Sequence, residues 1–409
     1  MQLVERHKIK LTHQFWQQID ELCFLSKNLY NYANYKVRQS FILGSVYLSY
    51  NKLYHLVKGT PDYKALPAKV SQQVLRLLDQ NWKSFFEANK AYKANPEKFQ
   101  ARPKLPKYKD KTKGRNVLVY TIQAVSKTQL KLGLVKLSGT NICLPTKVSN
   151  IRTARIVPRL GEYVVEIVYC QEENQTVTDR NIVAAIDIGV NNLAALTSNK
   201  PGFVPVLVNG RPLKSLNQYY NKTKAKLQSF LSKNKFSSKR IQQLTRKRNN
   251  RVDTYLHKAS SWIINHLDKQ GIGKLIIGNN PSWKRSVNLG AKINQSFTAI
   301  PHSRLIEMLV YKARLLGIEV QVREESYTSR ASFLSLDPIP NYGDDVSNIK
   351  FSGYRESRGM YKQKGSKTRI NADVQASYNL LRKEIPEIFS GRRIEGCVVR
   401  PVRLTPSRN

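Results

Sequence analysis

The chain has 409 residues, with 69 Lys and Arg against 28 Asp and Glu, and a formal net charge of +41. Because 41% of its residues are hydrophobic, it can bury the cores of two or three domains, which excludes intrinsic disorder as the default. A charge excess of this size repels itself in a compact fold, and a bound polyanion relieves that repulsion. We therefore expect a nucleic-acid partner.

The cysteines and the hydropathy pattern narrow the class of protein further. Its four cysteines are scattered singly, which argues against a disulfide framework and against a zinc site built from CxxC pairs. The sequence shows neither a signal peptide nor a run of about 18 apolar residues, so we expect no membrane partner and an intracellular location. A protein bound to a membrane surface is the alternative, but its charge would gather on one amphipathic helix.

The first part of the chain is predicted to be a short strand followed by helices. Residues 1–12 alternate between apolar and charged side chains, as in a strand. Apolar residues then recur at helical spacing from Trp16 to Tyr32 and from Val70 to Phe85, so we expect a helical region over 13–97. Its aromatic residues, most of them expected in the core, include Tyr30, Tyr32, Tyr35 and Trp82.

A basic segment and a β region follow. After Pro96 the sequence reads ARPKLPKYKDKTKGR, in which a helix is not expected. From Val117 to Cys170, short apolar runs separated by Gly, Pro, Asn and Ser predict a small β-barrel or a curled sheet. We expect residues 1–12 and 98–178 to form a nucleic-acid cradle, with an ordinary β domain that has a lysine-rich surface as the alternative. The candidate nucleic-acid contacts are Arg102, Lys104, Lys107, Lys109 and Lys111.

Residues 179–409 alternate strands with helices and predict an α/β layer around a mixed sheet. Strands are expected at IVAAIDIG, at 274–278 and at 318–323, and two antiparallel helices at 213–268. Within these helices, residues 222–251 contain eleven Lys and Arg and no acid, which favours phosphate contact over an ordinary solvated face. The candidate contacts here are Arg240, Arg246, Lys247, Arg248 and Arg251.

Acidic residues are scarce, so their positions in this last region are informative. Asp187 ends the strand IVAAIDIG, Glu324 and Glu325 follow the strand IEVQVR, and Asp373 lies near a helix start in INADVQASYNLL. Taken alone, Asp187 could cap a turn and Asp373 a helix, and the two glutamates could be surface charges. Together, three carboxylates on separate elements are the ligand set for two Mg²⁺ ions, which phosphodiester cleavage uses. No motif supports a Ser or Cys nucleophile with His, or a phosphate-binding glycine loop.

Four motifs in this region resemble the RuvC-type nuclease half of the TnpB family, transposon-encoded RNA-guided DNA endonucleases related to type V CRISPR effectors. They are AIDIGVNNLAAL, NQSFTAIPHSRLIEMLVYKARLLGI, EESYTS and INADVQASYNLL, within about residues 181–383. The resemblance implies an α+β multidomain protein, with a β wedge domain interrupted by a helical recognition domain and followed by an RNase H-like (RuvC) α/β nuclease domain. The wedge would be the predicted barrel.

The resemblance also implies partners, a cofactor and a location. The partners are a guide RNA from the transposon end and a double-stranded target DNA, and the cofactor is Mg²⁺, with two ions. Asp187 and Asp373 match the family's first and third catalytic acids. We accordingly expect a cytoplasmic protein of prokaryotic type that associates with the nucleoid.

One departure from the family concerns the second catalytic acid. The family commonly has a Glu where this chain has Gly278. In an RNase H-like sheet, the strand before Glu324 and Glu325 should lie beside the Gly278 strand, so one of these glutamates can reach the same metal pocket. Strand alternation puts the two on opposite sides, and we choose Glu325, with Glu324 as the second candidate. The alternative is a nuclease-inactive, RNA-guided DNA-binding protein.

A second departure concerns zinc. Many family members carry two CxxC pairs after the TS motif, but residues 329–367 of this chain contain no cysteine, so no zinc is expected. We expect a target-loading loop that is held by Phe333, Leu334, Phe351 and Tyr361 in place of a metal. Arg355 and Arg358 are candidates for phosphate contact, and an ordinary basic loop is the alternative. No motif supports the other rivals, a DNA-strand transferase or an RNA-packaging protein.

Overall fold

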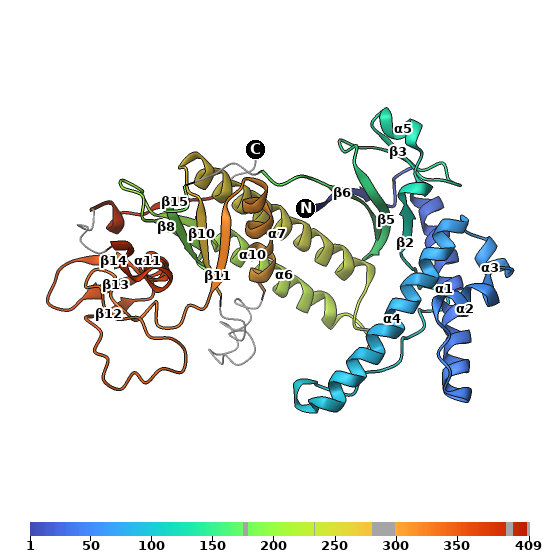
Figure 1. Ribbon diagram of the computed structural model, residues 1–409, viewed down its shortest axis with the longest axis horizontal. Coiled ribbons are helices and arrows are strands. Elements are labelled where there is room, and N and C mark those ends of the chain that lie inside the picture. The colour runs from blue at the N-terminus through green and yellow to red at the C-terminus, as the bar shows by residue number, and fades with distance from the viewer. Residues whose placement is uncertain (175–178, 233, 280–298, 390–395, 407–409) are drawn as a thin grey trace. The chain divides into compact units, whose positions relative to one another are not determined.

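The computed structural model describes residues 1–174, 179–232, 234–279, 299–389 and 396–406, and it divides the chain into two compact units (Figure 1). The first unit comprises residues 1–171 and the second residues 172–409. None of the helices in the described ranges is long and apolar enough to cross a membrane.

The first unit combines helices with an antiparallel sheet. Strand β1 (Gln2–Ile9) precedes helices α1 (Trp16–Gly44), α2 (Tyr50–Val57), α3 (Pro61–Lys64) and α4 (Ala68–Ala94). An extended segment then leads to β2 (Leu118–Thr121), α5 (Lys127–Lys131), β3 (Leu134–Lys136), β4 (Cys143–Pro145), β5 (Ile151–Arg159) and β6 (Glu162–Cys170). The sheet order is β1-β6-β5-β2, and β3 pairs only with β4. Over the described residues, the strands form an open sheet and a separate hairpin and do not close into the expected barrel.

Helices α1 to α4 are inserted in the chain between β1 and β2, two strands of one sheet. β1 pairs with β6 along its whole length, from Gln2 opposite Cys170 to Ile9 opposite Tyr163. Helices α1 and α4 bury their apolar faces on the sheet in one continuous core, to which they contribute Ile19, Leu29, Leu78 and Trp82. As expected, Trp82 and Tyr30 are core residues, whereas Tyr35 is 49% exposed.

The second unit is built on a mixed sheet. Its strands are β7 (Val183–Asp187), β8 (Asn192–Ser198), β9 (Val206–Asn209), β10 (Lys274–Gly278), β11 (Glu319–Arg323) and β15 (Val402–Leu404), in the order β11-β10-β7-β8-β9-β15. β8 is antiparallel to β7 and β9, whereas β10 pairs in parallel with both β7 and β11. The prediction that the strand before Glu324 lies beside the Gly278 strand is therefore confirmed.

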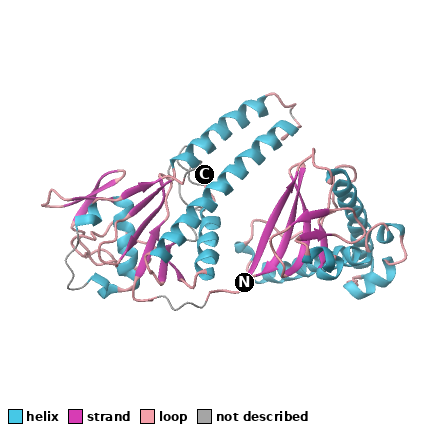
Figure 2. Cartoon of the chain, turned by 90° about the horizontal axis from the view of Figure 1, so that it is seen from above, coloured by secondary structure: helices cyan, strands magenta, loops and turns pink. Residues whose placement is uncertain are grey.

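Helices cover both faces of this sheet (Figure 2). Successive residues of β7 point to opposite faces, so Ala184 and Ile186 pack against α7 (Lys239–Lys269) and α10 (His302–Leu315). Val183 and Ala185 pack on the other face against α11 (Ala372–Glu384). Helix α6 (Arg211–Ser229) and α7 are the two helices predicted over 213–268. The predicted turn between them includes residue 233, and the quoted NQSFT motif begins at residues 294–298; these positions lie outside the described residues.

The segment between β11 and α11 contains a small sheet of β12 (Gly353–Ser357), β13 (Met360–Gln363) and β14 (Arg369–Asn371). Phe333 and Tyr361, the latter on β13, are buried. The Phe333 ring stacks on Tyr378 with centroids 4.4 Å apart. The carboxylate of Asp337 accepts hydrogen bonds from the backbone N–H groups of Ser332 and Ser352, each at 2.8 Å. This contact was not predicted from the sequence. Aromatic packing and this carboxylate hold the segment together.

Candidate active site

Three neighbouring parallel strands bring two of the candidate acids to one edge of the sheet. Asp187 is the last residue of β7, and Ile186 pairs with Ile277 of β10, so Gly278 lies next to Asp187. Gly278 in turn pairs with Arg323, the last residue of β11, and Glu325 follows two residues later. Since parallel strands end at the same edge, Asp187 and Glu325 come together there.

The carboxylate of Glu325 lies directly over Gly278. A Cβ atom added at position 278 would stand 2.6 Å from Oε2 of Glu325 and 2.8 Å from Cδ1 of Leu380. Both distances are too short for a real contact, so the missing side chain at 278 is what leaves room for this carboxylate. An acid from the next strand thus occupies the place that a side chain at 278 would enter.

The turn after Glu325 fixes its backbone. The N–H and the hydroxyl of Thr328 donate to the Glu325 carbonyl at 3.3 and 2.8 Å, and Tyr327 adopts a left-handed φ of 63°. The side-chain amide of Asn379 on α11 donates to the Thr328 carbonyl at 2.8 Å. The EESYTS motif is therefore a tight turn that α11 anchors.

Asp373 reaches the same edge from the first turn of α11. The Asn371 side chain caps this helix by accepting from the N–H groups of Asp373 and Val374. One turn later, the Ser377 hydroxyl donates to the Ala185 carbonyl of β7 at 2.9 Å, which ties the helix to the Asp187 strand. The side-chain amide of Asn192 donates to Oδ2 of Asp373 at 2.7 Å. Asn192 was not a predicted site residue, although it belongs to the AIDIGVNN motif.

The pKa values show that the acids influence one another. Burial, together with the Asp373 and Glu325 carboxylates, raises the pKa of Asp187 well above its usual range, and Arg355 offsets this in part. Burial, helped by Glu324, raises the pKa of Glu325 to about 7. The cluster therefore concentrates negative charge that has little solvation, and a cation would relieve this cost.

Glu324 points to a different partner. Its Oε2 accepts a hydrogen bond from Nζ of Lys383 at 2.6 Å, and its Oε1 accepts from the Ser326 N–H at 2.5 Å. Burial acts to raise the pKa of Glu324, but these hydrogen bonds outweigh it, and the pKa is lowered. The two glutamates, which follow the end of β11, thus have different partners, and the one paired with Lys383 is already neutralised.

The donor set at this edge fits Mg²⁺. Within the described ranges, no three acid, His or Cys side chains stand close enough to hold one ion together. Mg²⁺ needs only one or two carboxylates, because it keeps several waters. In addition, Oδ1 of the buried Asn192 has no hydrogen-bond partner among the described residues and is a further oxygen donor. Hard oxygen atoms of carboxylate and amide groups are the ligands that this ion prefers.

The predicted nucleic-acid contacts differ in the solvent exposure of their side chains. In the basic segment, Arg102, Lys104, Lys107 and Lys111 are exposed, whereas Lys109 is half-buried, with its ammonium 5.1 Å from the centre of the Tyr30 ring. In the segment after β11, Arg355 and Arg358 are exposed, and a guanidinium nitrogen of Arg355 lies 3.9 Å from Oδ1 of Asp373. Arg355 thus reaches the acidic cluster itself.

The candidates on α7 also divide into two groups. Arg240, Lys247 and Arg251 are exposed, and Arg246 is half-buried. Arg248 instead binds inside the unit, donating to Oδ1 of Asn217 on α6 at 2.7 Å and to the Ala299 carbonyl at 2.6 Å. Its hydrogen bonds hold α6 against α7, which the charge pattern alone did not reveal.

Comparisons with known proteins match the two parts of this site. The OrfB_IS605 family, described as a probable transposase, matches residues 166–284, and the Cas12f1-like TNB domain matches residues 302–380. No curated protein matches the sequence significantly.

Several solved structures are similar to the chain. A Cas12f1–sgRNA–target DNA complex is 14% identical, with a TM-score of 0.37, and the match covers 94% of this chain and 100% of that one. A CRISPR-Cas12f ternary complex is 13% identical, with a TM-score of 0.36 and coverage of 89% and 82%. Alicyclobacillus acidoterrestris C2c1 with single-guide RNA is 9% identical, with a TM-score of 0.35 and coverage of 90% and 70%.

The two family matches cover both the strand that carries Asp187 and the segment that carries Glu325 and Asp373. The resemblance predicted from the motifs is confirmed: the chain resembles the TnpB-like effectors of the RuvC type.

Proposed function

We propose that this protein is an RNA-guided DNA endonuclease of a transposon, in which Asp187, Glu325 and Asp373 form the metal site. The observation that carries the proposal is the Glu325 carboxylate over Gly278, 2.6 Å from the position of an added Cβ, at the sheet edge where β7 ends in Asp187. The matches to a probable transposase and to a Cas12f1-like TNB domain support the reaction class.

In this proposal the three acids hold two Mg²⁺ ions, which when bound would activate a water for attack and stabilise the leaving oxygen of the phosphodiester. The protein's own residues orient the acids. Asn192 holds Asp373 through a hydrogen bond of 2.7 Å, and the Thr328 turn fixes the backbone of Glu325. Arg355, 3.9 Å from Asp373, carries the positive charge that can contact the phosphate of the target strand.

The proposed partners are a guide RNA from the transposon end and a double-stranded target DNA, which the net charge of +41 and the two family matches support. Base pairing would read the target sequence, and the protein would read the backbone and a short flanking motif. Sequencing the RNA that co-purifies with the protein tests this. One defined RNA species that ends at a transposon boundary supports it, and a mixture of unrelated cellular RNAs contradicts it.

A cleavage assay with the co-purified guide, a matching DNA and Mg²⁺ tests the metal site. Asp187→Asn and Asp373→Asn keep the size of each side chain but remove its charge, so each should slow cleavage by at least about a hundredfold. Asp268→Asn, at an exposed position on α7, is the matched control and should cut like the parent. Cleavage by Asp187→Asn at the parent rate would show that the assignment is wrong. Guided binding by a parent that never cleaves would favour the nuclease-inactive alternative.

A further inference from the structure

One face of α1 carries a stripe of polar side chains beneath the basic segment. Positions 20, 27, 31, 34 and 38 are spaced three, four or seven residues apart, which puts them on a single helix face. Residues 102–117, which we call the strap, run antiparallel to α1 along this face. Its residues are met in reverse order, from 115 beside position 20 to 106 beside position 38. The stripe consists of Asp20, Lys27, Asn31, Asn34 and Arg38.

The middle of the strap is bound through its backbone. The side-chain amide of Asn31 donates to the Lys109 carbonyl and accepts from the Lys109 N–H, both at 2.9 Å. Asn34 and Arg38 donate to the Pro106 carbonyl at 3.0 and 3.1 Å. Because main-chain groups are satisfied by helix side chains, this part of the strap stays extended without being a strand of any sheet.

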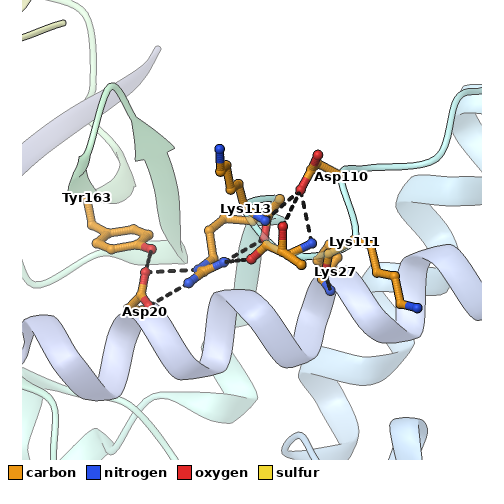
Figure 3. A network of polar contacts seen from close by, with 9 residues as sticks. Asp20, Lys27, Asp110, Lys111, Lys113 and Tyr163 are labelled. Carbon is orange, nitrogen blue, oxygen red and sulfur yellow. Dashed lines mark hydrogen bonds and ion pairs between the residues drawn. The ribbon is translucent and has the colours of Figure 1, made fainter. Parts of the chain in front are cut away.

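The other end of the strap is fixed by charge (Figure 3). Lys27, which is buried, donates to the Lys111 carbonyl at 2.7 Å. Arg115 forms a bidentate ion pair with Asp20 at 2.9 and 2.7 Å, and the Tyr163 hydroxyl donates to the same carboxylate. Asp110 closes a turn by accepting from the N–H of Lys113 at 2.6 Å.

These contacts use backbone groups of the strap and leave most of its cationic side chains exposed to solvent. Arg102, Lys104, Lys107, Lys111 and Lys113 are all exposed. Ordering five like charges along one short segment costs both conformational entropy and electrostatic repulsion. A buried lysine beneath them adds to the repulsion. This arrangement is favourable when a polyanion lies along the segment, because each phosphate contact then releases counterions from the nucleic acid, and the protein surface is already ordered.

We propose that α1 holds the strap as a preformed rail for the phosphate backbone of the duplex that contains the guide RNA, with Asn31 and Lys27 as positioning residues. This inference rests on the proposed function for the identity of its partner. It adds to that function a division of labour within the first unit, in which one helix face binds the strap and the strap binds phosphate.

Limited trypsin digestion tests the first half of the proposal without any nucleic acid. Asn31→Ala removes both hydrogen bonds to Lys109, so cleavage within residues 102–113 should speed up about tenfold. Asn89→Ala is the matched control, because the Asn89 amide donates to the Phe85 carbonyl of its own helix and, over the described residues, to no residue of the strap. Cleavage of Asn31→Ala at the rate of the parent would overturn the role of α1.

Binding to an RNA–DNA hybrid of about 20 base pairs tests the second half, in the full-length protein over a series of salt concentrations. Lys107→Gln/Lys111→Gln/Lys113→Gln should flatten the slope of log affinity against log salt by about two to three units, because three phosphate contacts are lost. Asn31→Ala keeps these charges, so it should weaken binding several-fold with an unchanged slope.

The results of these experiments distinguish a failure of the rail proposal from a failure of the proposed nuclease function. An unchanged slope in the triple variant overturns the rail, whatever the protein cleaves. Parent-like affinity in Asn31→Ala, alongside faster digestion, also overturns it, since preorganisation would then contribute nothing to binding. Loss of cleavage in Asp187→Asn with normal hybrid binding leaves the rail intact, because the metal site lies in the other unit.

Discussion

At position 278 the chain has no side chain, and the carboxylate of Glu325 fills the space that a Cβ would need. The pairing of Gly278 with Arg323 explains how this arises, since it brings the end of β11 beside the end of β10. A carboxylate two residues beyond that pair reaches back over the glycine. The two positions are therefore coupled, and a change at either one acts on the other.

Gly278→Ala should impair cleavage while leaving the fold intact. The added methyl group would stand 2.6 Å from Oε2 of Glu325 and 2.8 Å from Cδ1 of Leu380, both of which are the far ends of flexible side chains. The carboxylate moves aside, and we expect cleavage to fall about a hundredfold with little change in thermal stability. Gly359→Ala, where nothing lies within 4 Å of an added Cβ, is the matched control and should cut normally. Normal cleavage by Gly278→Ala would argue that Glu325 is not a ligand.

The metal-free protein should lose stability as the pH rises towards neutrality. Burial and the nearby Glu324 raise the pKa of Glu325 to about 7, above the value of about 4.3 in an unfolded chain. The folded state therefore keeps a proton that the unfolded state releases, and the contribution of this group is lost between about pH 4 and pH 7.

Thermal unfolding in the presence of a chelator measures this effect. Glu325→Gln, which mimics the protonated acid, should match the parent near about pH 4 and exceed it in stability near about pH 8. A difference between the two proteins that does not vary with pH would contradict the assignment of the raised pKa to Glu325.

At the scale of elements, α11 organises the site. Its first turn carries Asp373, its second turn ties it to β7 through Ser377, and Asn379 anchors the turn after Glu325. Its last turn carries Lys383, the partner of Glu324. One helix thus sets the position of two acids and neutralises a third, so the packing that holds α11 also holds the geometry of the site.

Phe333→Ala should therefore destabilise the second unit. The Phe333 ring is buried and stacks on Tyr378 of α11 at 4.4 Å, so its removal leaves a cavity that costs about 3 to 5 kcal/mol. Urea unfolding monitored in this unit provides the measurement. Phe230→Ala, at a side chain that is 73% exposed, should change stability by less than about 0.5 kcal/mol. Equal effects of the two substitutions would mean that this aromatic contact does not support α11.

Sequence patterns predicted these elements well where a local signal existed. The alternation and apolar runs of β10 and β11 and the helical spacing of α7 depend on neighbours in the chain. The order of β10 and β11 is confirmed, and the choice of Glu325 over Glu324 as a metal ligand stays a prediction. Contacts between distant segments left no such signal: Asn192 meets Asp373, and Arg248 meets Asn217. Closure of the expected barrel is likewise not confirmed, because β1 and β2 lie at opposite edges of an open sheet over the described residues.

Across the whole molecule, the cationic side chains behind the net charge of +41 have different roles. Some cations are structural, as Arg248 and Lys27 are, and others are exposed for a partner. Composition cannot distinguish the two groups, since both raise the net charge by the same amount. Their effects on nucleic-acid binding and on stability should differ.

Salt-dependent binding separates the two groups on α7. Arg240→Gln/Lys247→Gln/Arg251→Gln should flatten the slope of log affinity against log salt by about two to three units, because three exposed cations are lost. Arg248→Gln should leave the slope nearly unchanged but lower the thermal stability, since it breaks hydrogen bonds to Asn217 and Ala299. Similar slopes for the parent and the triple variant would remove α7 from the nucleic-acid surface.

The central claim, that Glu325 supplies the acid missing at Gly278, is tested most directly by moving the carboxylate. The measurement is the rate of Mg²⁺-dependent cleavage of a guide-matched DNA by the parent, by Glu325→Gln and by Gly278→Glu/Glu325→Gly. We predict that Glu325→Gln loses at least about a hundredfold in rate. The double variant, in which the clash between the Glu325 carboxylate and a side chain at position 278 is gone, should recover much of this loss. Parent-like cleavage by Glu325→Gln would contradict the account.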